Sequence, residues 1–346
     1  MIATLMAAAA AFAVTVLGTP VLIRWLRARG VGQQIRDDGP FEHPHVAKAG
    51  TPTMGGVAIV GATVVGYLFA HLRRENVAFA SSGWTLLLLI VGLGAVGFVD
   101  DYLAVRHRRN LGLRKRGKTV GIVAVASVFA LVAIDWVEVS TRLSFTRPLE
   151  IDLGEAGWVL WAVFVIYAMS NAVNFTDGLD GLAAGSSALS LSAFVVICFT
   201  QFRHPEIYEI LPAQALDLAI IAAAMTGACA GFLWWNAAPA RIFMGDTGSL
   251  AIGGALGGLA LLSRTNLLLP ILAGLTVIEA ASVLAQVVSY RGFRRRVLRM
   301  APIHHHFEVG GWSEFTIIVR FWLFAGICVA LGVGIFYADF LRFGLE

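Results

Sequence analysis

The chain has 346 residues, of which 58% are apolar and 14% are charged, whereas soluble domains contain roughly 45–50% apolar and about 25% charged residues. This composition excludes an ordinary soluble protein. The formal net charge is only +4. Because the basic residues concentrate in a few loops, we expect membrane sidedness to explain them, and we expect no nucleic-acid partner.

Ten apolar segments follow one another along the chain. They lack the alternation of a transmembrane strand, and backbone amides inside hydrocarbon need partners within their own segment, so we expect helices. Neither a repeat nor a low-complexity linker is visible, so residues 1–346 are predicted to form a single integral membrane domain, an all-α polytopic membrane protein. The ten predicted transmembrane segments are 2–23, 53–70, 84–99, 119–135, 157–172, 183–201, 214–234, 248–262, 267–289 and 316–340.

Lys and Arg are distributed unevenly between the two sets of loops that these segments define. One set holds 18 of the 26 basic residues and the other holds seven, with Arg320 inside the last segment. The positive-inside rule therefore predicts that the richer set is cytoplasmic and that both termini lie outside. The outer loop 136–156 contains a β-prone stretch from Leu143 to Ile151, for which we expect a short surface element. The predicted cytoplasmic loops are residues 24–52, 100–118, 173–182, 235–247 and 290–315.

Two adjacent carboxylates, Asp100 and Asp101, directly follow the segment that ends at Val99. Two such groups at a membrane boundary repel each other, so one should have a raised pKa unless a cation lies between them. The alternative is a solvated pair that ends the helix before the basic loop. The pattern alone does not decide between these interpretations.

Polar side chains recur every three residues at the end of the fifth segment. Neighbours three apart share a face of an α-helix, but the stripe drifts, so all of them converge only if Gly178 or Gly181 bends the chain or a 3₁₀ turn intervenes. An ordinary turn is the alternative, although two carboxylates without a basic residue in the same loop argue against it. The four residues are Asn171, Asn174, Asp177 and Asp180.

A glycine-containing motif, Phe243 to Ser249, places Asp246 immediately before an apolar helix. An Asp at this position is typical of an N-cap. The neighbouring glycines also let a phosphate approach backbone N–H groups, although the motif is neither a dinucleotide nor a P-loop fingerprint.

Three consecutive histidines, His304, His305 and His306, follow a run of arginines. Consecutive residues on a regular helix cannot all point at one metal ion, and the usual zinc spacings are absent, so we expect no zinc site. Binding of an anionic ligand, proton transfer near neutral pH and a solvated loop remain as alternatives.

All of these groups fall at predicted cytoplasmic ends of helices. Carboxylates, asparagines and abundant Lys and Arg at one membrane face are typical of phosphoryl chemistry with a hard cation, because Mg²⁺ takes carboxylate, phosphate and water oxygens as ligands. Basic loops can hold a polyphosphate, and a site at the membrane edge suits a lipid-linked acceptor. The sequence therefore predicts a magnesium-assisted transferase site at the cytoplasmic face.

The motifs taken together closely resemble those of the phospho-N-acetylmuramoyl-pentapeptide-transferase family, one of the polyprenyl-phosphate N-acetylhexosamine-1-phosphate transferases. The resemblance covers nearly the whole chain, with five motifs in order. They are Thr51 to Gly56, Asp100 to Tyr102, Asn171 to Gly181, Phe243 to Leu250 and Pro302 to Glu308.

The resemblance implies a ten-helix, Mg²⁺-dependent enzyme of the bacterial inner membrane. It implies transfer of phospho-N-acetylmuramoyl-pentapeptide from UDP-N-acetylmuramoyl-pentapeptide to undecaprenyl phosphate, which gives lipid I and UMP for peptidoglycan synthesis. The expected partners are therefore these two substrates and the lipid bilayer. The oligomeric state is undecided, with a homodimer among the alternatives.

The resemblance also implies roles for single residues. Asp246 is similar to the Mg²⁺ ligand, and Asp100 to the carboxylate that deprotonates the lipid phosphate, with Asp101 beside it. Phe243 matches the aromatic residue that stacks on uracil. Asn171, Asn174, Asp177 and Asp180 belong to the substrate-binding stretch, His304, His305 and His306 match an essential histidine stretch, and Lys48 and Lys118 fit positions near phosphates.

One position departs from the family pattern. Family members often carry a Lys three residues after the Asp pair, and here that residue is Ala104, so a phosphate contact there would require Arg106 or another base. Two other functions remain as alternatives: a related transferase acting on UDP-N-acetylglucosamine, and an ion-coupled transporter. Transporters place such carboxylates near the midplane, often within repeats, and this chain shows neither feature.

Overall fold

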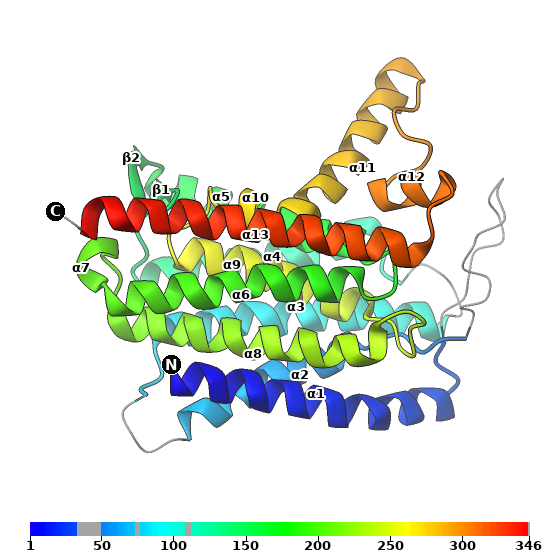
Figure 1. Cartoon of the computed structure of the whole chain (residues 1–346), viewed down its shortest axis with the longest axis horizontal. Helices are drawn as coiled ribbons and strands as arrows, with labels where there is room; N and C mark the ends of the chain where they lie inside the picture. The colour runs from blue at the N-terminus through cyan, green and yellow to red at the C-terminus, as the bar shows by residue number, and fades with distance from the viewer. Residues whose placement is uncertain (33–49, 73–76, 108–111, 345–346) are drawn as a thin grey trace.

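The computed structural model describes residues 1–32, 50–72, 77–107 and 112–344, and most of these residues are helical. The long helices run side by side as a bundle, with both chain termini at one end (Figure 1). Each of the ten predicted segments overlaps one long helix. The helices are α1 (Ile2–Ala28), α2 (Gly56–His71), α3 (Ser81–Arg106), α4 (Lys115–Asp135), α5 (Gly154–Thr176), α6 (Leu182–Arg203), α7 (Pro205–Tyr208), α8 (Pro212–Asn236), α9 (Gly245–Leu262), α10 (Leu269–Leu272), α11 (Gly274–Phe293), α12 (Ile303–Val309) and α13 (Glu314–Gly344).

Seven helices of the described residues are long and apolar enough to cross a membrane, and α2 is apolar but has only 16 residues. This confirms a polytopic helical membrane protein. The expectation of ten spans with outside termini stays a prediction, because α2, α9 and α11 fall outside the set of seven. That set is α1, α3, α4, α5, α6, α8 and α13.

The ninth predicted segment, residues 267–289, is divided in the structure. Pro270 lies in the first turn of the short helix α10, and a new helix, α11, begins at Gly274 and continues to Phe293. Proline lacks a backbone N–H and is favoured at the start of a helix, which explains a boundary here inside an apolar run. The far half of α11 projects away from the bundle (Figure 1). The predicted loop 290–315 contains a further helix, α12.

The strands β1 (Arg142–Ser144) and β2 (Pro148–Asp152) form an antiparallel hairpin in which Arg142 pairs with Asp152. Most of β2 is exposed. The hairpin confirms the short surface element that was predicted between the fourth and fifth segments.

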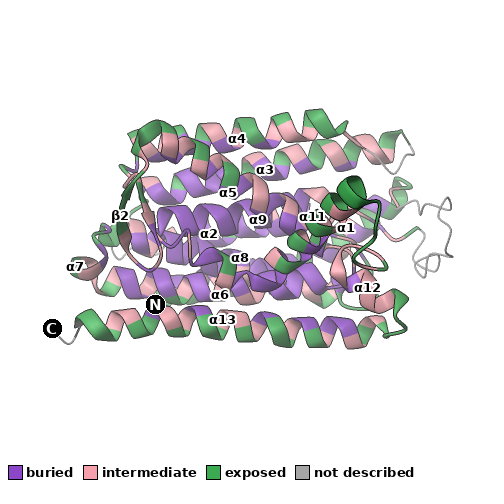
Figure 2. Ribbon diagram, turned by 90° about the horizontal axis from the view of Figure 1, so that it is seen from above, coloured by how far each residue is buried: buried purple, intermediate pink, exposed green. Residues whose placement is uncertain are grey.

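Helix α9 occupies the centre of the bundle, and all of its residues from Thr247 to Leu262 are buried (Figure 2). Its glycines allow neighbouring helices to approach closely. A Cβ on Gly253 would lie 2.4 Å from the Met169 carbonyl oxygen of α5, and one on Gly254 would lie 2.2 Å from the Leu93 side chain of α3. Small residues at helix contacts permit such close packing in membranes. The N-terminus of α9, which carries Asp246, is thereby held between α3 and α5.

Candidate active site

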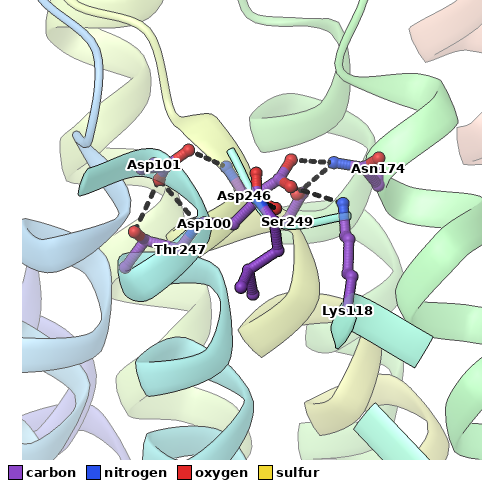
Figure 3. A network of polar contacts seen from close by, with 8 residues as sticks. Asp100, Asp101, Lys118, Asn174, Asp246, Thr247 and Ser249 are labelled. Carbon is purple, nitrogen blue, oxygen red and sulfur yellow. Dashed lines mark hydrogen bonds and ion pairs between the residues drawn. The ribbon is translucent and has the colours of Figure 1, made fainter. Parts of the chain in front are cut away.

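Three carboxylates meet where the end of α3 approaches the start of α9 (Figure 3). One oxygen atom from each of Asp100, Asp101 and Asp246 lies within 4.8 Å of the other two. Carboxylate oxygens in this number are the ligands that Mg²⁺ and similar hard cations prefer. The structure therefore brings together the two acidic motifs that the sequence predicted to form one site.

Asp101 is directed at the N-terminus of α9. Its Oδ1 accepts a hydrogen bond from the Asp246 backbone N–H at 2.9 Å, and its Oδ2 accepts from the Thr247 N–H at 2.9 Å and the Thr247 hydroxyl at 2.6 Å. Only 7% of this residue is exposed. Asp101 thus caps α9 from another helix, because its negative charge satisfies N–H groups that the helix leaves unpaired.

Gly245 makes this capping contact sterically feasible. It adopts a left-handed φ of +72°, and a Cβ built on it would lie 2.6 Å from Asp101 Oδ2. Glycine tolerates this conformation and leaves room for the carboxylate.

Asp246 is held by two side chains from two further helices. Lys118 of α4 forms an ion pair with Asp246 Oδ2, and Asn174 of α5 donates from Nδ2 to Asp246 Oδ1 at 2.6 Å (Figure 3). Asn174 also lies 2.9 Å from the Ser249 hydroxyl. Four helices, α3, α4, α5 and α9, therefore contribute to one polar site whose acidic charge is partly balanced by Lys118.

Asp100 is more exposed than its neighbour, and its environment differs. Its Oδ1 accepts a hydrogen bond from the Leu113 backbone N–H at 2.9 Å. It makes this contact with the loop before α4, whereas Asp101 points at α9. The two adjacent aspartates therefore share the cluster with Asp246 but have different backbone partners.

The Thr51 to Gly56 motif pairs with the Phe243 motif through the backbone. The Phe243 N–H donates to the Pro52 carbonyl, and the Gly55 and Gly56 N–H groups donate to the carbonyls of Phe243 and Met244, all at 2.8 Å. This pairing places the partly exposed Phe243 ring next to the start of α9.

The stretch from Asn171 to Gly181 does not converge on one point. Asn174 reaches the carboxylates, whereas Asn171 donates to the Tyr167 carbonyl within α5 at 2.8 Å. Asp180, which is 4% exposed, accepts from the Ala240 N–H at 2.9 Å. Gly181, with φ +79°, supplies the expected bend before α6. The stretch thus links α5 to the carboxylates and to the 236–243 loop.

Asp177 lies just beyond the end of α5, on the side of the carboxylate cluster. Burial raises its pKa to about 7, and the negative charges of Asp246, Asp101 and Asp180 act in the same direction. A carboxyl group in such a place favours its protonated form or a nearby cation.

The three histidines of α12 have three different partners. His304 Nδ1 lies 3.0 Å from Glu279 Oε2, His305 Nδ1 lies 2.8 Å from Glu308 Oε2, and His306 Nδ1 accepts the Arg299 backbone N–H at 3.1 Å. The three imidazoles therefore face three different neighbours.

Lys48 lies outside the described residues, so its predicted place near a phosphate is untested. Glu279 and Asn236 were not predicted, although each contacts a site residue or the loops beside the site. Asn236 accepts the Gly181 N–H at 3.1 Å and donates to the Ile242 carbonyl at 2.9 Å. Glu279 had a detectable signal, because a carboxylate inside an apolar segment is a candidate functional residue.

Comparison with known proteins agrees with this geometry. The family model for glycosyl transferase family 4 matches residues 83–264, and a signature of phospho-N-acetylmuramoyl-pentapeptide-transferases matches residues 48–60. The chain is 51% identical to the phospho-N-acetylmuramoyl-pentapeptide-transferase of Frankia alni, with 98% of each chain covered. It is 50% identical to that of Mycolicibacterium vanbaalenii, covering 97% of this chain and 98% of the relative. For Saccharopolyspora erythraea the identity is 48%, covering 99% of this chain and 98% of the relative. The predicted resemblance is thus confirmed, and this multi-pass bacterial membrane protein belongs to the phospho-N-acetylmuramoyl-pentapeptide-transferase family.

Proposed function

We propose that this protein transfers phospho-N-acetylmuramoyl-pentapeptide from UDP-N-acetylmuramoyl-pentapeptide to undecaprenyl phosphate, which yields lipid I and UMP. The names of its full-length relatives support this reaction. The structural observation that carries it is the cluster of Asp100, Asp101 and Asp246, with Lys118 paired to Asp246. Such a cluster can hold a cation beside a pyrophosphate.

The donor set fits Mg²⁺, with Asp246 as its principal ligand in this proposal. The three clustered carboxylates supply only oxygen ligands, with no sulfur or imidazole among them. Hard cations prefer such oxygen ligands. Bound Mg²⁺ would supply positive charge to the pyrophosphate and to the leaving UMP. The remaining contribution of the protein is positioning and electrostatic stabilisation.

In the proposed direct displacement, an oxygen of the lipid phosphate attacks the β-phosphorus of the UDP-sugar. A bond forms from that oxygen to phosphorus, and the bond to the oxygen that bridges to the α-phosphate breaks with its electron pair on UMP. Asp100 takes the proton of the lipid phosphate, because it is the more exposed of the two adjacent aspartates. Asp101 holds α9 and Asp246 in place through its three hydrogen bonds.

Other residues bind the substrate in this proposal. Phe243 stacks on uracil, and Lys118, with Lys48, lies near the phosphates. His304 of α12 lies against Gly178 in the loop between α5 and α6, and in this proposal His304, His305 and His306 contribute to the same site. The polar residues at the end of α5 and in that loop lie on the nucleotide side in this proposal; they are Asn171, Asn174, Asp177 and Asp180.

The proposed orientation puts this site at the cytoplasmic face of a ten-helix protein with both termini outside. The site lies at the end of the bundle away from the termini (Figure 1). Described basic residues at the end of α1 and the start of α4 lie at that same end, which favours the cytoplasm by the positive-inside rule. A water-soluble nucleotide and a membrane-bound phosphate can both reach a site at this position.

UMP release by the purified protein tests the proposal. We expect release only when undecaprenyl phosphate, UDP-N-acetylmuramoyl-pentapeptide and Mg²⁺ are all present. Equal or greater release from UDP-N-acetylglucosamine would identify a related transferase instead. Absence of lipid-dependent release from either nucleotide sugar would refute the transferase function.

The covalent alternative has its own test, in which the enzyme is mixed with labelled UDP-substrate alone. Direct displacement predicts that no labelled protein is trapped and that Asp100→Asn is inactive. Trapped phosphosugar on an aspartate would establish a covalent intermediate.

A further inference from the structure

A fully buried carboxylate and imidazole join α11 to α12 behind the site. Glu279 Oε2 lies 3.0 Å from His304 Nδ1, and both side chains are 0% exposed. Burying either group without a polar partner would be costly. The two atoms are close enough for ionic attraction, although their angles do not form a hydrogen bond. Glu279 thereby sets the orientation of the ring.

The opposite side of the His304 ring faces the loop between α5 and α6. A Cβ built on Gly178 would lie 2.2 Å from His304 Nε2, so the ring rests directly against the backbone of that glycine. Gly178 lies between Asp177 and Asp180. A chain of contacts therefore runs from Glu279 through His304 to the loop that carries two predicted site residues.

The same face of α11 holds the rest of the segment that leads to α12. The Ser282 hydroxyl accepts the Ile303 N–H at 3.0 Å, and Gln286 Oε1 accepts the N–H groups of Val297 and Leu298 at 3.0 Å each. Residues 279, 282 and 286 are spaced by three and four, which places them on one helix face. Of these three residues on α11, Glu279 lies nearest the site.

We propose that Glu279 is a positioning residue that acts through His304 to hold the Asp177–Asp180 loop in its substrate-binding geometry. This inference rests on the proposed function, in which that loop binds the nucleotide. Without the carboxylate, the buried His304 ring loses the charged neighbour at Nδ1 that holds its orientation. The loop then loses the surface on which Gly178 rests.

A double-mutant cycle tests this proposal, with UMP as the binding probe. The four proteins are wild type, Glu279→Leu, His304→Leu and the double variant, and the dissociation constant for UMP is measured for each. We expect Glu279→Leu to weaken UMP binding about tenfold in the wild-type background and less than about twofold in the His304→Leu background, because contacting residues give non-additive effects. Equal effects in both backgrounds would overturn the proposal, as would an unchanged affinity in Glu279→Leu.

Two further variants separate positioning from general loss of stability. Glu279→Gln keeps a side-chain oxygen with the same reach toward Nδ1, so we expect its UMP affinity to stay within about threefold of wild type. Asp217→Asn is the matched control, since Asp217 Oδ1 lies 2.9 Å from His71 Nε2 with both side chains 1% exposed, in a buried pair between α2 and α8. It should leave UMP affinity unchanged. A comparable loss in this control would overturn the proposal.

The cycle remains informative if the leucine variants fail to accumulate, because Glu279→Ala and His304→Asn, which remove the same contact with smaller side chains, form a second cycle with the same criterion. Wild-type UMP release reports on the proposed function separately. A wild-type enzyme that turns over, together with an additive cycle, refutes the positioning role alone.

Discussion

Replacing Asp101 by Asn tests whether this residue acts by capping α9. The carboxylate accepts three hydrogen bonds, two from backbone N–H groups and one from a hydroxyl. An asparagine has one accepting oxygen, so its NH₂ group must face at least one of these donors. A hydrogen bond to a charged group contributes about 1.5–3 kcal/mol, and we expect the free energy of unfolding to decrease by about that amount.

The kinetic consequence follows from the position of Asp246. Loss of the cap lets the first turn of α9 shift, and a displacement of about 1 Å at a reacting centre can lower the rate about 100-fold. We therefore expect Asp101→Asn to reduce UMP release about 100-fold and to raise the Mg²⁺ concentration that gives half-maximal activity.

Asp100→Asn is the matched control, because it removes an adjacent carboxylate that accepts a single backbone hydrogen bond from Leu113. We expect it to be inactive in UMP release with little change in the midpoint of thermal unfolding. The capping argument would be refuted if Asp101→Asn unfolded at the same temperature as wild type and retained its Mg²⁺ dependence.

Three more predictions concern the metal site, the glycine contact and pH. Asp246→Ala should abolish Mg²⁺-dependent UMP release while the protein still purifies as a folded species, and retained activity would contradict its role as ligand. Gly178→Ala should impair UMP binding, because the added Cβ would lie 2.2 Å from His304 Nε2, whereas Gly61→Ala, with no atom within 4 Å, should be neutral. The pKa of Asp177 is raised to about 7 in the folded protein and is about 3.9 in an unfolded chain. The unfolded state therefore binds fewer protons between these values, and the contribution of Asp177 to stability decreases as pH rises from about 4 to about 7. In chelator, Asp177→Asn should thus unfold at a higher temperature than wild type at pH 8 and at a similar temperature at pH 4.5; parallel curves would contradict this.

The location of the carboxylates argues against the transporter alternative. Asp100 and Asp101 lie near the end of α3, and Asp246 lies in the first turn of α9. Ion-coupled transporters place such groups near the midplane on interrupted helices. The carboxylates here lie instead near the ends of the helices that carry them.

Much of the architecture was predictable because the physical signals are local. Long apolar runs predict helices, because backbone N–H and C=O groups in hydrocarbon must form hydrogen bonds within their own segment. The β-prone stretch between two of these runs predicted the hairpin that joins α4 to α5. Asp100, Asp101, Asp246 and the histidines were recognisable because polar groups at the ends of apolar segments have few purely structural explanations. The boundary at Pro270 was missed because the residues on both sides of it are apolar.

Local sequence determined which segments are helices and which charged groups collect at their ends. Only the tertiary structure decided which partner each of two adjacent residues contacts and how exposed each one is. Successive positions on a helix point about 100° apart, so the packing of α3 against α9 turns Asp101 into a cap and leaves Asp100 more exposed. In the same way, the packing of α12 on α11 buries His304 against Glu279, while His305 and His306 have other partners. Contacts between residues distant in the chain depend on how the helices pack, and that information is spread over the whole bundle rather than contained in any one motif.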